Sequence, residues 1–319
     1  MKIMMFIRFI LGMMLASAAM LALADTDLPT KFTNIDSIAN TRHNLTQSTI
    51  GAGASSMNSY RNDYGEVCVY CHTPHGANGT LDAPLWNRTQ LNTSYTTYDT
   101  LGTSTLTQAV SAPGVNSLTC LSCHDGTVAV DSIINMPNAN ANGVASDNYL
   151  ASQESSQNNT FLNSWTNASG ADATTHIGLA SAQNGASEGD GCLACHSPDA
   201  GIVGTGATDF RIFAIGTDLT NDHPVGITYP TARTLGADAD FNATSGSLPG
   251  QMTWYDDGDG RPQKDEIRFY DTGDGPEVEC ASCHDPHGVP SGGAGSQFNA
   301  TFLRTANSGS AVCQTCHNK

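Results

Sequence analysis

The sequence has few of the residues that normally build a hydrophobic core. Hydrophobic residues make up 39% of its 319 residues and aromatic residues 7%, whereas glycine occurs 32 times. A chain with so little aliphatic content and so many turn formers buries too little apolar surface for a large conventional core. We therefore expect a mostly irregular, loop-rich fold with short helices and a few short strands. Something other than the side chains must organise it.

Positive charge is also scarce. The chain has 13 Lys and Arg residues against 30 Asp and Glu residues, and its formal net charge is −17. Without a basic patch, nucleic acid is excluded as a natural partner, and binding to an anionic membrane surface is disfavoured. An acidic protein of this kind suits cationic partners, metal ions or metal-oxide surfaces.

Long apolar segments are absent except at the N-terminus. Lys2 and Arg8 precede an apolar run over residues 9–23, and Ala22-Leu23-Ala24 has the form of a cleavage site for a secretory signal. A membrane anchor is the alternative, but the run is short for a span of about 20 residues. We expect residues 1–24 to be a cleaved signal peptide and residues 25–319 to form one domain. Loss of Lys2 and Arg8 would lower the net charge from −17 to −19.

Cysteine, in contrast, is abundant and regularly arranged. Each cysteine belongs to a C-x-x-C-H motif, and the five motifs span residues 68–72, 120–124, 192–196, 280–284 and 313–317. The ten cysteines are Cys68, Cys71, Cys120, Cys123, Cys192, Cys195, Cys280, Cys283, Cys313 and Cys316. This motif is the attachment sequence of c-type haem. The two thiols add to the two vinyl groups of one porphyrin, and the adjacent histidine binds the iron.

Three other interpretations of the cysteines compete with haem attachment. Ten cysteines in a secreted protein could form five disulfides, paired C-x-x-C units could bind zinc, and a single C-x-x-C could be a dithiol redox centre. None of these requires a histidine directly after every second cysteine. The sequence therefore predicts five covalently bound haem c groups.

The histidines match the predicted irons in number. Five are the proximal ligands His72, His124, His196, His284 and His317, and the other five are His43, His75, His176, His223 and His287. Methionine is the usual competitor for the distal position. Only three methionines would remain after removal of the signal peptide, which is too few for five irons. We therefore predict bis-histidine ligation of all five haems. The alternative is that one or two of these histidines cap turns or lie on the surface.

Two of the distal candidates follow a proximal histidine by three residues. His75 follows His72, and His287 follows His284. In a helical turn, residues i and i+3 project to the same side, whereas two ligands of one iron approach from opposite sides. His75 and His287 should therefore bind the irons of neighbouring haems.

The order of the motifs suggests how the distal histidines are distributed. We expect His75 to pair with the iron of His124, and His287 with the iron of His317. His223 is a candidate for the third haem, and His43 and His176 are left to the remaining irons without a firm assignment.

The chain contains an internal repeat. A C-x-x-C-H-x-P-H-G segment followed by a further C-x-x-C-H motif occurs over residues 68–124 and again over residues 280–317, with the third motif between them in sequence. The sequence predicts loops at 135–173 and 231–250. It predicts short strands at 210–215, 226–229 and 266–270, where β-branched and aromatic residues gather. Short helices are expected around the haem motifs.

An acidic run at residues 255–260 could bind calcium. If it is counted as an EF-hand loop from Tyr255, Glu266 falls at the twelfth position. The first position would then be Tyr instead of Asp, and Pro262 would occupy the eighth. An irregular Ca²⁺ site and a solvated turn both remain open.

The segments CVYCHTPHGA, CLSCHDGT, NDHPVGITYP and CASCHDPHG resemble those of multihaem cytochromes with doubled C-x-x-C-H motifs. More narrowly, they resemble subunits of extracellular cytochrome filaments (nanowires) of metal-reducing bacteria. The resemblance implies a loop-rich fold around a chain of stacked haems and end-to-end polymerisation into a homopolymer. It also implies that a histidine of one subunit can bind a haem of the next, for which His43 is the candidate.

The sequence thus predicts a pentahaem electron-transfer protein, extracellular or on the cell surface, that passes electrons to other redox proteins or to metal oxides. A discrete periplasmic or surface carrier is the alternative. A multihaem reductase is less favoured, because catalysis needs an iron with an open position and the histidine count leaves none.

Overall fold

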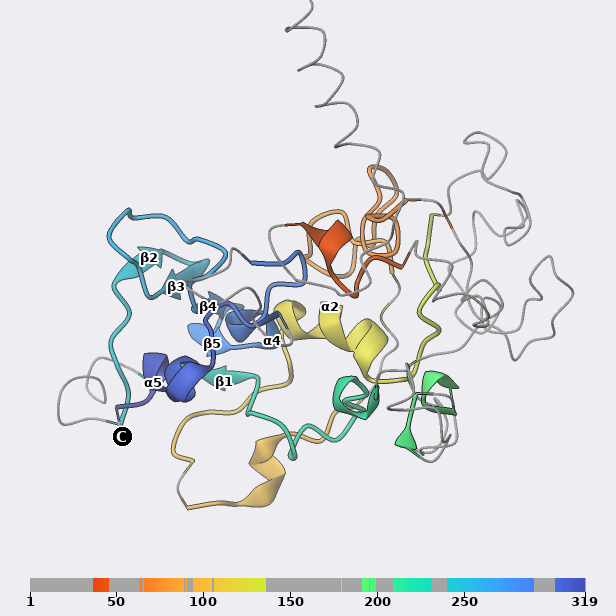
Figure 1. Cartoon of the computed structure of the whole chain (residues 1–319). Coiled ribbons are helices and arrows are strands. Elements are labelled where there is room, and N and C mark those ends of the chain that lie inside the picture. Colours follow the sequence, from red (N-terminus) through yellow and green to blue (C-terminus); the bar gives the residue numbers. More distant parts are fainter. Residues whose placement is uncertain are drawn as a thin grey trace, which may run out of the picture. The chain divides into compact units, whose positions relative to one another are not determined.

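The computed structural model describes residues 37–45, 64, 66–88, 90, 94–104, 106–135, 179, 191–194, 196–198, 209–230, 240–289 and 302–318. All of them lie in one compact unit, Thr33–Lys319 (Figure 1). The expected signal peptide, His176 and Cys195 lie outside the described residues, as does nearly all of the expected loop at 135–173.

Short helices carry most of the C-x-x-C-H motifs. The second motif lies in α2 (Val115–His124), the fourth in α4 (Cys280–Cys283) and the fifth in α5 (Ala311–Cys316). The third begins in the 3-10 helix η7 (Gly191–Ala194), and the first forms consecutive turns over 67–71. One helical turn places residues i and i+3 on the same side, so the two cysteines of a motif can reach one porphyrin edge.

The described residues contain four further 3-10 helices, one before the first motif and three between motifs. They are η1 (Ile38–Asn40), η3 (Tyr98–Leu101), η9 (Arg211–Phe213) and η12 (Ser308–Ser310). Such short pieces are typical connectors. A strand was expected at 210–215, but this segment contains η9 instead. Among the described residues, no helix is long and apolar enough to cross a membrane.

The strands form one small antiparallel sheet with the order β1-β5-β4-β3-β2. They are β1 (Ile227–Thr228), β2 (Gly246–Leu248), β3 (Met252–Trp254), β4 (Arg268–Asp271) and β5 (Pro276–Val278). β1 and β4 fall in segments for which strands were expected. β2 falls in the expected loop at 231–250. Gly246 in β2 lies against the ring of Trp254, so no side chain would fit there.

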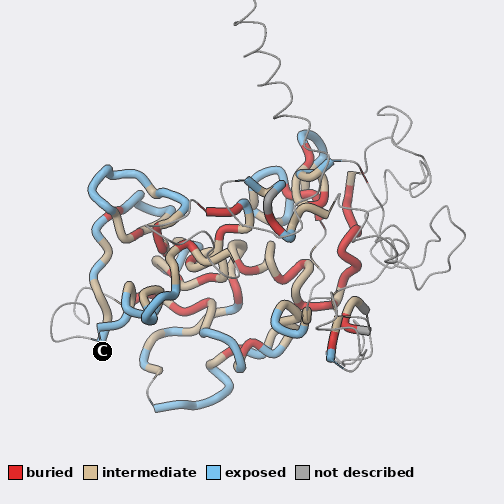
Figure 2. The backbone as a smooth tube through the Cα atoms, viewed as in Figure 1, coloured by how far each residue is buried: buried red, intermediate tan, exposed pale blue. Residues whose placement is uncertain are grey.

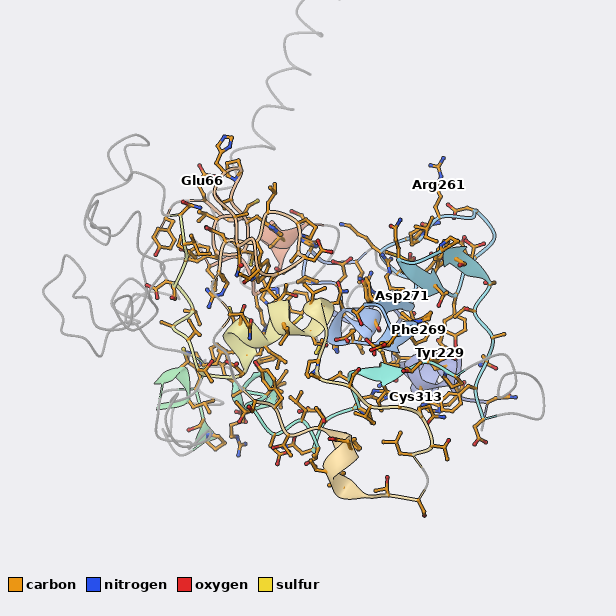
Figure 3. All side chains as sticks on the ribbon, turned by 180° about the vertical axis from the view of Figure 1, so that it is seen from behind. Glu66, Tyr229, Arg261, Phe269, Asp271 and Cys313 are labelled. Carbon is orange, nitrogen blue, oxygen red and sulfur yellow. The ribbon has the colours of Figure 1, made fainter. Side chains whose placement is uncertain are left out.

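The apolar core is divided into small clusters. One consists of Tyr64, Tyr70 and Ile133, and the other of Tyr229, Ile267 and Phe269. α5 packs against the second cluster through residues 312 and 316 (Figure 3, in which Tyr229, Phe269 and Cys313 are labelled). Buried residues occur in short stretches along the described chain (Figure 2). The small size of the clusters agrees with the low hydrophobic content of the sequence. Side chains alone therefore bury little apolar surface, and a bound cofactor could add to it.

Candidate metal centres

His72 and His287 come together from opposite ends of the chain. Their ring centroids are 6.1 Å apart, and their ring planes are inclined by 17°. A metal–imidazole bond is about 2 Å long and the bonded nitrogen lies about 1 Å from the ring centroid, so two imidazoles on opposite sides of one ion have centroids about 6 Å apart. The separation therefore fits one metal ion between the rings. The expected partner of His287 was the iron of His317, and the structure instead places His287 beside His72.

His43 and His124 form a second pair with the same spacing. Their centroids are 6.0 Å apart and their planes are inclined by 71°. The His43 ring stacks on Phe302 at 4.5 Å, and its Nδ1 lies 3.3 Å from the carbonyl oxygen of Pro286. These contacts fix the ring so that it faces His124 of the same chain. His43 was expected to serve the next subunit, and His75 was the expected partner of His124.

The surroundings of this second pair favour neutral imidazoles. Burial, followed by the electrostatic effect of His124, lowers the pKa of His43 to about 4, although the Pro286 carbonyl partly opposes this. Burial likewise lowers the pKa of His124. A metal-binding imidazole must be neutral, so these shifts keep the nitrogens available to a metal near neutral pH.

His223 and His317 are a third pair of histidines that lie near each other. Burial lowers the pKa of His223, and His317 is near enough to lower it further by electrostatic repulsion. The ring of Phe241 packs beside His317 at a centroid distance of 5.0 Å. His223 was a candidate for the third haem, and the structure places it near the histidine of the fifth motif.

The remaining histidines are placed as follows. His196 of the third motif stacks on Phe210 at 3.8 Å with ring planes 6° apart. His284 of the fourth motif forms a β-bridge with Leu303. His75 is exposed, and its backbone carbonyl oxygen accepts a hydrogen bond from the side-chain amide of Asn135 at 2.9 Å.

Backbone carbonyls orient two of the proximal histidines. Nδ1 of His72 lies 2.8 Å from the carbonyl oxygen of Pro84, and Nδ1 of His124 lies 2.7 Å from that of Phe213. A hydrogen bond at Nδ1 fixes the tautomer and leaves Nε2 free for a metal. Sequence reasoning missed these acceptors, because every residue offers a carbonyl and no residue type marks the ones that are used.

Several of the cysteines lie in surroundings that disfavour thiolate ligands. The described cysteines form no disulfide with one another. Burial raises the pKa of the Cys71 and Cys316 thiols to about 12 and that of Cys283 to about 11. Such surroundings disfavour the thiolate that zinc requires. Over the described part of the chain, the cysteines and histidines do not gather in groups of three or more that could hold a zinc ion.

A buried donor beside His72 also fits a bound cofactor. Trp86 is 8% exposed, and its ring meets that of His72 edge-on at 5.7 Å. Its indole Nε1 has no hydrogen-bond acceptor among the described residues. Because a buried N–H normally has a partner, this donor indicates that an acceptor belongs near His72. A haem carries such acceptors on its propionates, so the residues present fit this group.

The acidic loop brings three carboxylates together. Oxygen atoms of Asp256, Asp257 and Asp259 lie within 4.8 Å of one another. Two of these carboxylates accept hydrogen bonds from backbone N–H groups of the same loop. Asp256 accepts from residues 258 and 260, and Asp259 accepts from residue 261. Glu266, the expected twelfth ligand of a calcium loop, accepts from the N–H groups of Asp257 and Gln263. These contacts favour a solvated turn over a Ca²⁺ site.

A comparison with protein families finds one match, which covers part of the chain. Residues 275–319, which contain the fourth and fifth motifs, match the doubled CXXCH motif. No curated protein matches the chain. The doubled motif points to a multihaem c-type cytochrome with covalently bound haem c, and domains of this kind are generally electron carriers.

Proposed function

We propose that the chain is a pentahaem c-type cytochrome that conducts electrons along haems with two histidine ligands each. The observation that carries the proposal is the spacing of about 6 Å in the His72–His287 and His43–His124 pairs, which suits one metal ion between two imidazoles. Each pair joins a histidine of a C-x-x-C-H motif to one of the five further histidines, as the ligand count requires.

The residues have distinct roles in this proposal. Bound haem iron would supply one-electron exchange between the ferric and ferrous states. The cysteines would hold the porphyrin covalently and the paired histidines would bind its iron, while the carbonyls of Pro84 and Phe213 keep the rings of His72 and His124 in place. If every haem has two histidine ligands, as the histidine count predicts, no iron would be open to a substrate, and this argues for a carrier over a reductase.

We further propose that the subunits assemble into an extracellular filament. The resemblance to filament-forming cytochromes and the acidic composition, which suits contact with metal oxides, support this assembly. His43 is the residue originally expected to link subunits, but its position beside His124 favours a role within its own chain. The exposed His75 is therefore the better candidate for a ligand that one subunit gives to the next.

Three measurements test the proposal. The intact mass of the secreted protein should equal that of residues 25–319 plus five haems. A mass without haem would show that the chain is not a c-type cytochrome. Electron microscopy of the native protein, sheared from the cell surface, should then show uniform filaments. Discrete particles with five haems each would establish the alternative function, a discrete periplasmic or surface carrier. N-terminal sequencing that starts at Met1 would refute signal cleavage and secretion by that route.

A further inference from the structure

The second and fourth motifs are joined at the N-terminal ends of their helices. Glu279, which is 1% exposed, precedes α4, and its carboxylate accepts hydrogen bonds from the N–H of Gly114, at 2.9 Å, and from the hydroxyl of Ser117 in α2. The Ser117 hydroxyl in turn accepts from the N–H of Cys280 at 2.9 Å. These two residues thus connect α2 directly to α4, although more than 150 residues separate them.

The hydrogen bond between Ser117 and Cys280 brings the attachment cysteines of the two motifs close together, because Ser117 lies one helical turn before Cys120 in α2. The two thiols are near enough to alter each other's pKa, which is raised for Cys120 and lowered for Cys280. In the haem-bound protein these sulfur atoms would be thioethers on two different porphyrins. The edges of the two porphyrins would therefore begin close to each other.

Further cysteine contacts extend this arrangement in both directions. Cys123 of the second motif is close enough to Cys71 of the first to affect its pKa electrostatically. Cys283 of the fourth motif affects the pKa of Cys316 of the fifth in the same way. The contacts thus connect the motifs in the order first, second, fourth, fifth.

The third motif approaches the second from another side. His196 stacks on Phe210, whose ring meets that of Phe213 at 5.9 Å. The carbonyl oxygen of Phe213 lies 2.7 Å from Nδ1 of His124. Phe210 and Phe213 thus form a continuous set of contacts between His196 of the third motif and His124 of the second. This route does not pass between α2 and α4.

We infer that electrons pass directly between the second and fourth haems and that the third haem is a side branch joined to the second. The inference rests on the proposed function. Electron transfer slows steeply with the gap between porphyrin edges, so the shortest contact determines the route. In each step one ferrous iron is oxidised, the neighbouring ferric iron is reduced, and no bond forms or breaks.

The iron positions of the full-length, haem-loaded protein test this order. Anomalous diffraction at the iron edge, or a cryo-electron microscopy map, gives every iron–iron distance. We expect the irons of His124 and His284 to be nearest neighbours and the iron of His196 to be nearest to that of His124. An iron of His196 that lies between the other two, closer to each than they are to one another, would overturn the inference. If the protein contains no iron, the proposed function itself fails, so the two failures are distinguishable.

A variant gives a second test by kinetics. In Cys280→Ala/Cys283→Ala the fourth haem is absent, and its loss should slow electron redistribution between the first and fifth haems at least tenfold. The intact mass of the variant confirms that four haems remain. Redistribution at the wild-type rate would contradict the direct route. If the variant does not fold, the iron positions decide the question alone.

Discussion

His72 and His287 lie with their ring centroids 6.1 Å apart, although one belongs to the first motif and the other comes three residues after the end of the fourth. This separation is the one expected for two imidazoles bonded to opposite sides of one metal ion. The pair also ties the two halves of the internal repeat together, since one haem would take its two axial ligands from both. Bound haem should therefore stabilise the fold as well as carry electrons.

Replacement of His287 by Ala should open the distal side of the first haem. Cys68, Cys71 and His72 still hold the haem, so the haem count should stay at five while one iron becomes high-spin. Electron paramagnetic resonance should show a ferric high-spin signal equal to one iron per chain. Added cyanide should bind that iron, and a map should place it opposite His72. Cyanide opposite His317 would show that the original pairing was right. Leu101→Ala, an exposed position, is the control and should keep all irons low-spin.

Replacement of His43 by Met tests whether this ligand acts within its own chain. Methionine in place of a distal histidine raises the potential of a haem, within the roughly 0.8 V range that axial ligands control. We expect one of five midpoint potentials to rise, both in isolated subunits and in any assembled form. A rise that occurs only after assembly would mean that His43 binds a haem of the next subunit.

The sequence predicts which residues bind haem, but it gives no guide to which of them lie together. The C-x-x-C-H motif is local chemistry, so its spacing alone names the cysteines and the proximal histidines. A distal ligand is a long-range contact, and its spacing from the nearest motif says nothing of its partner. The structure places His43 and His287 beside histidines of motifs far from their own positions, a proximity that the sequence did not indicate.

The fold was predictable to the same limited degree. The β-branched and aromatic residues around Ile227 and Phe269 correctly predicted strands where the structure has β1 and β4. The apolar segment at 210–215 was expected to be a strand, but it contains η9. The two phenylalanines of this segment instead lie between His196 and His124. A run of apolar residues cannot distinguish burial in a sheet from packing against a cofactor ligand.

Arg88 should be a principal contributor to stability. It is fully buried, and its guanidinium donates hydrogen bonds to the carbonyl oxygens of Ser122, Ala129 and Val130 and to the Ser122 hydroxyl. Arg88→Met would leave these buried acceptors without donors, at a cost of about 3–5 kcal/mol. Urea unfolding followed by circular dichroism measures the loss. Arg261→Met, at an exposed position, is the matched control and should change stability by less than about 0.5 kcal/mol. Equal effects of the two variants would contradict this role.

Glu279 should make the stability of the α2–α4 junction depend on pH. Burial raises the pKa of its carboxyl from 4.5 to about 7, although Ser117 and Gly114 partly compensate. The folded state therefore binds more protons than the unfolded state between about pH 4.5 and pH 7, and stability falls as the pH rises through this window. At pH 8 the ionised carboxylate should cost at most about 3 kcal/mol.

The substitution Glu279→Gln removes this ionisation but keeps an oxygen acceptor for the N–H of Gly114. The variant should therefore gain stability relative to the wild type as the pH rises from 5 to 8, as measured by urea unfolding at each pH. Glu66→Gln removes the same charge at an exposed position and should show no such trend. If the difference between Glu279→Gln and the wild type is constant with pH, the carboxyl titrates alike in the folded and unfolded states. The junction would then have to be open to water, since only exclusion of water disfavours the charged form in the absence of a cationic partner.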